Sequence, residues 1–264
     1  RPQLVLSVDL GYSPRGELFD VCLAAGLETI TWNAAHKNNQ LMLKRYSRAN
    51  RDVHPASLSV RTWHDLQAQP WTHAERERLR RELVGSYLSG EWYGEVGTQF
   101  HTTLQEAAEI RRALDLDDRK KTAVIFSHIF WDGTFFYGTD LFGSYEEWFV
   151  ETMKVACANP HLNWIVKIHP ANIVKNVRDG VGSEPSELTA IRSLGETLPA
   201  HVRVVQPDSH MSTLSLYSVM DYCVTVRGTV GIEAASFGIP VLTAGTGRYD
   251  RLDFTIDSES RAEY

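Results

Sequence analysis

The stretch from Asp221 to Thr243 constrains the fold of this chain more than any other part of the sequence. An apolar run suited to a strand (222–226) leads into a glycine-containing turn. A helical segment (229–237) and a second short apolar run (240–243) follow. Two consecutive strands joined by a helix run parallel in one sheet. The stretch therefore predicts one unit of a parallel α/β sheet.

The same alternation extends through the second half of the chain. Strands are predicted at 122–127, 162–168 and 202–206, and helices at 144–157, 186–197 and 212–219. Short apolar strands between helices are typical of a doubly wound parallel sheet. Such sheets bind their ligands at the carboxyl ends of the strands.

The first part of the chain gives a less regular pattern. Strands at 4–9 and 27–32 flank a helix at 16–25, further helices are predicted at 38–49, 73–89 and 103–114, and 51–72 is predicted to be irregular. The polar segment 115–121 favours a domain boundary. We therefore expect an N-terminal domain at 1–118 and a C-terminal domain at 119–264.

Composition excludes several classes of protein. With 264 residues and a net charge of −6, the chain offers no electrostatic case for binding nucleic acid. Its three cysteines are scattered, which favours free thiols in a reducing compartment, and no Cys/His spacing indicates a metal site. No apolar run reaches membrane-spanning length, so we expect a cytoplasmic protein. Because the chain starts at Arg1 without Met, we also expect a fragment of a longer protein.

The turn at residues 227–229 has the features of an anion site. A helix N-terminus presents unpaired N–H groups, Gly228 lets a phosphate approach the backbone, and Arg227 adds a cationic donor. Glu233 lies one helical turn after Thr229 and can accept hydrogen bonds from a ribose. The alternative is structural: Thr229 is only an N-cap, and Glu233 only a carboxylate favoured by the helix dipole.

A second element ends the predicted strand at 162–168. His169 can donate to a phosphate from the strand's carboxyl edge, where Pro170 stops the strand and Lys167 adds charge. The alternative is that His169 merely caps a loop. Because the 227–233 turn is predicted at the same edge, the phosphate site is the favoured interpretation.

The segment from Ile129 to Phe149 is rich in aromatic residues, which can stack on sugars and bases. Trp148 and Phe149 lie on a predicted helix and are expected in the core. Ser127, His128 and Asp132 flank the start of the segment and are candidates to reach a substrate. Asp132 is a candidate catalytic carboxylate, or else a turn former before Gly133.

Two more positions are candidates. Ser212 or Thr213 is expected to cap a helix, in a loop whose main chain can also hold a nucleobase. Asp9 ends a predicted strand beside Gly11, where a carboxylate can act as general base or nucleophile. An ordinary turn residue is the alternative for Asp9, and His36 is a second candidate in this part of the chain.

Three stretches carry a family resemblance: Tyr137–Phe142, Val166–Pro170 and Thr225–Glu233. They resemble the nucleotide-binding half of GT-B glycosyltransferases, and more narrowly bacterial capsule-polysaccharide biosynthesis proteins, which include Kdo transferases that use CMP-Kdo. The resemblance covers 120–264 well and the rest only vaguely. It implies an α/β, GT-B-like fold of two Rossmann-like domains with parallel sheets, the N-terminal one truncated and the C-terminal one holding the nucleotide-sugar.

The resemblance also implies an activity. A sugar, with CMP-Kdo as one candidate donor, would move from a nucleotide to a surface polysaccharide or lipid-linked glycan, without a cofactor. His169, Pro170 and Thr229 would hold the phosphate. Association with a capsule assembly or peripherally with the inner membrane would fit. The alternatives are a nucleotide-sugar enzyme resembling UDP-GlcNAc 2-epimerase, and a non-catalytic sugar-nucleotide-binding module of a capsule-assembly protein.

Overall fold

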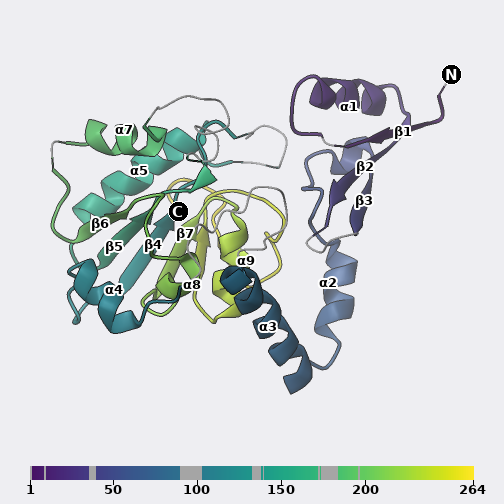
Figure 1. The fold of residues 1–264 in the computed structure, drawn as a ribbon. Helices are drawn as coiled ribbons and strands as arrows, with labels where there is room; N and C mark the ends of the chain where they lie inside the picture. The colour runs from purple at the N-terminus through teal and green to yellow at the C-terminus, as the bar shows by residue number, and fades with distance from the viewer. Residues whose placement is uncertain are drawn as a thin grey trace.

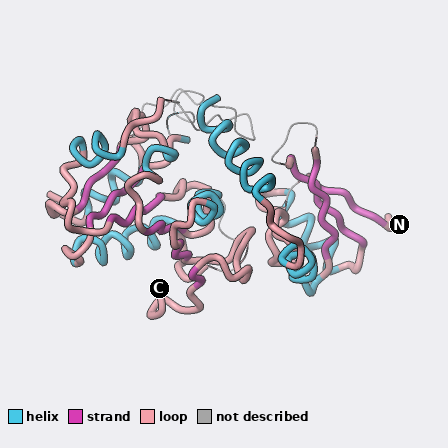
Figure 2. The backbone as a smooth tube through the Cα atoms, turned by 90° about the horizontal axis from the view of Figure 1, so that it is seen from below, coloured by secondary structure: helices cyan, strands magenta, loops and turns pink. Residues whose placement is uncertain are grey.

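Two β-sheets that lie side by side organise the molecule (Figure 1 and Figure 2). The computed structural model describes residues 2–8, 10–35, 40–89, 103–132, 138, 140–171, 173, 184–195 and 197–264. Within these residues, the first part of the chain forms a three-stranded sheet and the second part a six-stranded sheet.

The smaller sheet is mixed. Strand β1 (Leu4–Ser7) pairs parallel with β2 (Glu28–Ala34), and helix α1 (Arg15–Ala24) connects them, as predicted. Strand β3 (Leu41–Tyr46) then pairs antiparallel with β2. A small core of Leu10, Phe19, Leu23 and Tyr46 joins α1 to this sheet.

The prediction of a helix at 38–49 is wrong, and with it the expectation that this sheet is wholly parallel. Leu41, Met42, Leu43, Lys44 and Arg45 have no strong preference for a strand. The segment becomes one through its pairing with β2, because tertiary context overrides a weak local preference.

One face of the smaller sheet carries uncovered apolar side chains. Partners across a sheet point to the same face. The pairs Leu6–Ile30 and Trp32–Leu43 therefore lie together on one face, as does Leu41. Leu6, Leu41 and Leu43 are each more than 60% exposed. The other face packs against α1.

Three helical segments follow the smaller sheet: the 3₁₀ turn η1 (Arg48–Asn50), α2 (Val60–Gln67) and α3 (His73–Ser89). The bounds of α3 are those predicted. Helix α2 was not predicted; it begins at Ser59, whose hydroxyl accepts a hydrogen bond from the Thr62 N–H at 3.1 Å. Helix α3 leads the chain towards the larger sheet (Figure 1).

The larger sheet is parallel throughout and has the strand order β6-β5-β4-β7-β8-β9. Its strands are β4 (Thr122–Phe126), β5 (Asn163–Lys167), β6 (Val202–Val205), β7 (Tyr222–Thr225), β8 (Val241–Thr243) and β9 (Ile256–Asp257). In chain order this is the 3-2-1-4-5-6 arrangement of a Rossmann sheet, and the order reverses between β4 and β7. The predicted parallel sheet is confirmed, while β9 was not predicted.

Helices cover both faces of this sheet. They are α4 (Ala107–Ala113), α5 (Tyr145–Ala158), α7 (Ser186–Ser193), α8 (Thr213–Leu216) and α9 (Thr229–Ser236). Alternate residues of β4 point to opposite faces: Ile125 packs with α5 and α7, and Val124 with α4, α8 and α9 (Figure 1). Strands buried on both faces explain the uninterrupted apolar runs of the sequence.

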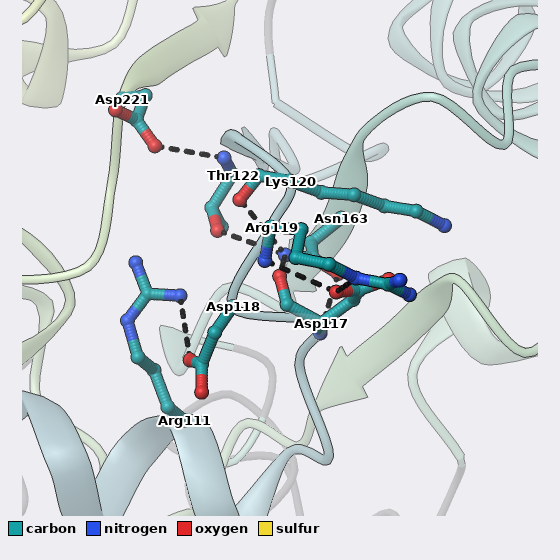
Figure 3. A network of polar contacts seen from close by, with 8 residues as sticks. All are labelled: Arg111, Asp117, Asp118, Arg119, Lys120, Thr122, Asn163 and Asp221. Atoms are coloured by element: carbon teal, nitrogen blue, oxygen red, sulfur yellow. Dashed lines mark hydrogen bonds and ion pairs between the residues drawn. The ribbon is translucent and has the colours of Figure 1, made fainter.

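Polar contacts fasten the amino ends of the strands (Figure 3). Asp221 accepts a hydrogen bond from the Thr122 N–H at 2.9 Å, and the Asn163 side chain donates to the Asp117 carbonyl at 2.9 Å. This network ties residues 115–121 to the sheet at the edge opposite the strands' carboxyl ends. The domain division at 118/119 stays a prediction.

Candidate functional site

A cavity of about 460 Å³ lies at the carboxyl ends of the central strands, where the strand order reverses. Residues from the first part of the chain, including Tyr12 and His54, form part of its lining. The candidate residues that line it are Ser127, Asp132, Lys167, His169, Pro170, Ser212, Arg227, Gly228, Thr229 and Glu233. The structure thus brings them around one cavity. Asp9 and His36 lie outside the described residues.

The turn before α9 presents main-chain donors to this cavity. Gly228, not Thr229, is the N-cap of α9, so the N-cap interpretation of Thr229 is wrong. Gly228 has no side chain to accept the first amide N–H groups of α9, and a ligand can take that place. A Cβ at position 228 would lie 3.0 Å from Oγ1 of Thr225, so the Thr225 side chain would have to shift slightly to admit one.

Arg227 brings a buried positive charge to the same turn. Its side chain is only 6% exposed and forms an ion pair with Asp140. Within the described part of the chain, its Nε and Nη1 atoms have no hydrogen-bond partner. Burial lowers the pKa of Arg227 to about 10, so the guanidinium stays charged at neutral pH. A buried cation with unused donors favours an anionic ligand.

His169 and Lys167 lie at the end of β5. The Ala171 N–H donates to Nδ1 of His169 at 3.1 Å, and the His169 N–H donates to the Ser127 hydroxyl at 3.1 Å. Burial first, and Lys167 second, lower the pKa of His169 to about 4. The neutral ring therefore carries its proton on Nε2. Burial lowers the pKa of Lys167 to about 8.

Ser127 has a structural role in addition to its place in the lining. Its hydroxyl accepts from the His169 N–H and donates to the Lys167 carbonyl at 3.3 Å. It thereby fastens the end of β4 to the end of β5.

His128 lies beside the turn before α9. Its Nε2 accepts a hydrogen bond from the Arg227 N–H at 3.2 Å, and its ring stacks on Tyr145 at 4.5 Å. Burial, followed by the charge of Arg227, lowers its pKa to about 3. Because Nε2 accepts, the neutral ring carries its proton on Nδ1.

Glu233 is buried at the wall of the cavity. It accepts hydrogen bonds from the hydroxyls of Tyr87 and Tyr217, the latter at 2.9 Å. Burial raises the pKa of Glu233, and these hydrogen bonds oppose the effect. Tyr87 was not predicted from the sequence, because a hydrogen bond between residues 146 positions apart leaves no local pattern.

Asp132 connects the two walls of the cavity. Its carboxylate accepts a hydrogen bond from the Tyr12 hydroxyl, and its N–H donates to the Ile129 carbonyl at 2.9 Å. Asp132 therefore forms a turn and also presents a carboxylate to the cavity. Its negative charge acts on Arg227.

His54 is a cavity residue that sequence analysis missed. The Ala56 N–H donates to Nδ1 of His54 at 3.0 Å, just as the Ala171 N–H does to His169. The tripeptide His54-Pro55-Ala56 repeats His169-Pro170-Ala171, and this repeat is the signal that could have found it. Burial, followed by the charges of Arg248 and Arg227, lowers the pKa of His54 to about 3.

Two other expectations are confirmed. Ser212 caps α8, because its hydroxyl accepts from the Ser215 N–H at 3.2 Å. Trp148 and Phe149 lie in the core, 1% and 0% exposed. Within the aromatic segment, residues 133–137 and 139 lie outside the described residues.

A comparison with solved structures finds similar chains. KpsC, beta Kdo 2,4 transferase, from Thermosulfurimonas dismutans matches 97% of this chain and 73% of its own, at 12% identity and a TM-score of 0.50. KpsC, beta Kdo 2,7 transferase, from the same organism matches 94% and 75%, at 16% identity and a TM-score of 0.47. The UDP-GlcNAc 2-epimerase of Neisseria meningitidis matches 52% and 30%, at 17% identity and a TM-score of 0.35.

The first of these similarities shows the fold. The chain has a GT-B-like α/β architecture, as the resemblance in its sequence implies. No protein-family model and no curated protein sequence matches the chain.

Two further findings concern the described residues alone. They contain no group of three or more His, Cys, Asp and Glu side chains arranged to hold a metal ion. None of their helices combines the length and apolarity needed to cross a membrane.

Proposed function

We propose that the chain is a glycosyltransferase that binds a nucleotide-sugar in the cavity and transfers its sugar to a glycan. One observation carries the proposal: His169, the first amides of α9 and Arg227 line a single cavity at the point where the strand order reverses. Open α/β sheets bind nucleotides at this point. The GT-B-like fold supports the proposal.

The leaving phosphate would bind between the ends of β5 and β7. Arg227, the α9 amides and the Nε2–H of His169 would stabilise the charge that develops on it as the glycosidic bond breaks. Buried donors that are already oriented are effective in this role, and removing one typically costs about 10²–10³ in turnover. Lys167 would add to this field.

The rest of the donor and the acceptor would occupy the remaining walls. Glu233 would accept from the ribose hydroxyls. Asp132, or Asp9 outside the described residues, would act as base or nucleophile. Closure of the two walls would keep water from the donor.

The finer assignment is a Kdo-type transferase that uses CMP-Kdo and builds a surface polysaccharide or a lipid-linked glycan. The name of the KpsC protein with the matching fold supports it. A cytoplasmic location, with peripheral association with the inner membrane or a capsule assembly, belongs to the same proposal.

A thermal-shift screen of CMP, UDP, GDP, CDP and dTDP tests the proposal. A nucleotide at 100 times its dissociation constant adds about 2.7 kcal/mol, which raises the Tm of a chain of this size by about 5–11 °C. We expect a shift with at least one nucleotide, and a CMP-only shift for a Kdo-type enzyme.

Variants locate the site. His169→Ala is expected to reduce the shift strongly, while His161→Ala, which alters an exposed histidine before β5, is expected to keep it. If no nucleotide shifts the Tm, or if His169→Ala responds like the wild type, the proposed site is wrong. Turnover of the nucleotide-sugar without an acceptor would instead indicate an epimerase.

A further inference from the structure

The carboxylate of Glu233 is held by two phenols. The Tyr87 and Tyr217 hydroxyls both donate to the same atom, Oε2, and the two phenol oxygens lie 3.3 Å apart. Glu233 is 4% exposed and Tyr87 is also 4% exposed. A buried carboxylate with two donors on one oxygen has a fixed orientation.

The arrangement leaves the other oxygen to different partners. The two phenol hydrogen bonds described above both go to Oε2, and Glu233 lines the cavity. The Thr229 side chain, one turn earlier on α9, also interacts with the carboxylate. The two tyrosines therefore help to fix the orientation of this carboxylate at the cavity wall.

The position of Tyr87 in α3 is unusual. Among the 17 residues of this helix, Tyr87 alone is buried. The Tyr87 ring lies edge-on to Tyr217 at 6.3 Å, in the apolar cluster that also holds Ile110 and Leu216, and its hydroxyl donates to Glu233. The ring is thus buried among apolar side chains, while its hydroxyl contacts the carboxylate.

We propose that Tyr87 is a positioning residue for nucleotide recognition: it holds Oε2 of Glu233 so that Oε1 can accept from the ribose hydroxyls of a bound nucleotide. This inference rests on the proposed function. The competing geometry is that Tyr87 fills the place of the ribose and must leave before a nucleotide binds. The two make opposite predictions for the removal of one hydroxyl.

The test compares Tyr87→Phe with the wild type by isothermal titration calorimetry. The probes are CMP and UDP, each paired with its 2′,3′-dideoxy analogue. We expect Tyr87→Phe to weaken binding of the ribonucleotide about tenfold, because a hydrogen bond that orients the carboxylate is lost. Binding of the dideoxy analogue is expected to stay within about twofold of wild type, because the analogue lacks the ribose hydroxyls from which Glu233 would accept.

Two further variants complete the design. Tyr217→Phe removes the second donor to Oε2 without altering α3 and is expected to show the same selective loss. It also decides the outcome if Tyr87→Phe fails to fold. Tyr222→Phe, which alters a phenol that is 41% exposed at the start of β7, is the matched control and is expected to bind like wild type.

Several results would overturn the inference. Equal losses for both members of a nucleotide pair would mean that the tyrosines only support the fold. Tighter binding by Tyr87→Phe would mean that Tyr87 blocks the ribose. Unchanged binding would show that Tyr87 has no positioning role, and it would not contradict the proposed function. A wild type that binds neither CMP nor UDP would refute the proposed function, and this inference with it.

Discussion

Three histidines around the cavity share one hydrogen-bonding arrangement: His54, His128 and His169. A main-chain N–H donates to one nitrogen of each ring, and burial holds each pKa well below its usual value. Each neutral ring therefore has a single N–H in a defined place. The Nε2–H of His169 can therefore bind an anion without adding buried positive charge to the free protein.

The lowered pKa values of these histidines predict how the free energy of unfolding depends on pH. The folded-state pKa values are about 3, 3 and 4, below the value of about 6.5 in an unfolded chain. Between these values the unfolded chain binds more protons, so stability falls as the pH falls through 6.5 towards 4. Each histidine contributes a slope of about 1.4 kcal/mol per pH unit.

Urea denaturation between pH 4.5 and 7.5 measures this slope. His169→Gln is expected to reduce the slope by the contribution of one histidine. His161→Gln, at an exposed position, is expected to leave the slope unchanged. A stability that does not change over this range would mean that the three rings are not neutral and buried.

At the scale of elements, glycine has opposite roles in two helices. A Cβ at Gly231 of α9 would lie 2.2 Å from the Tyr249 hydroxyl, which donates to the Gly228 carbonyl at 2.7 Å. A Cβ at Gly85 of α3 would meet no atom within 4 Å. The first position therefore needs glycine for a close approach, and the second does not.

We expect Gly85→Ala to stabilise the protein and Gly231→Ala not to. Gly85→Ala gains up to about 1 kcal/mol from helix propensity. Gly231→Ala has the same gain but loses about 1–3 kcal/mol through overpacking against the Tyr249 ring, so it is destabilising or at best neutral. Thermal unfolding of both variants measures the difference. A gain of equal size at both positions would show that Tyr249 does not pack as described.

The elements also show what a sequence can and cannot predict. Strand β4 was predictable because a strand that is buried on both faces has an unbroken apolar sequence. Strand β3 was not, because its pairing with β2 comes from the tertiary structure. The candidate residues at strand ends were predictable, since parallel topology brings those ends together. Tyr87 and Glu233 meet through distant segments, which no local pattern encodes.

At the scale of the whole molecule, the cavity depends on both parts of the chain. The Tyr12 hydroxyl, from the loop that follows β1, donates to Asp132, from the loop that follows β4. His54 lines the cavity from the same part of the chain as Tyr12. A ligand in this cavity would therefore contact both walls.

Asp132 gives a test at this scale. Asp132→Ala is expected to lower transferase turnover by about 10²–10⁴, the usual contribution of a general acid or base. The dissociation constant of the nucleotide is expected to change by less than about threefold, because the phosphate donors lie on other residues. Steady-state kinetics and calorimetry separate the two effects. Asp118→Ala, in the network at the amino ends of the strands, is the control. Full turnover by Asp132→Ala would exclude Asp132 as base or nucleophile.

The smaller sheet has a practical consequence for work on this protein. Its uncovered leucines can make the molecule adhere to itself at the concentrations used for crystallisation or NMR. Neighbouring residues of a strand point to opposite faces, so Leu43 can be exchanged for lysine while Met42, beside it, keeps its place in the cavity wall. Solubility and ligand binding can thus be engineered separately, one on each side of the same strand.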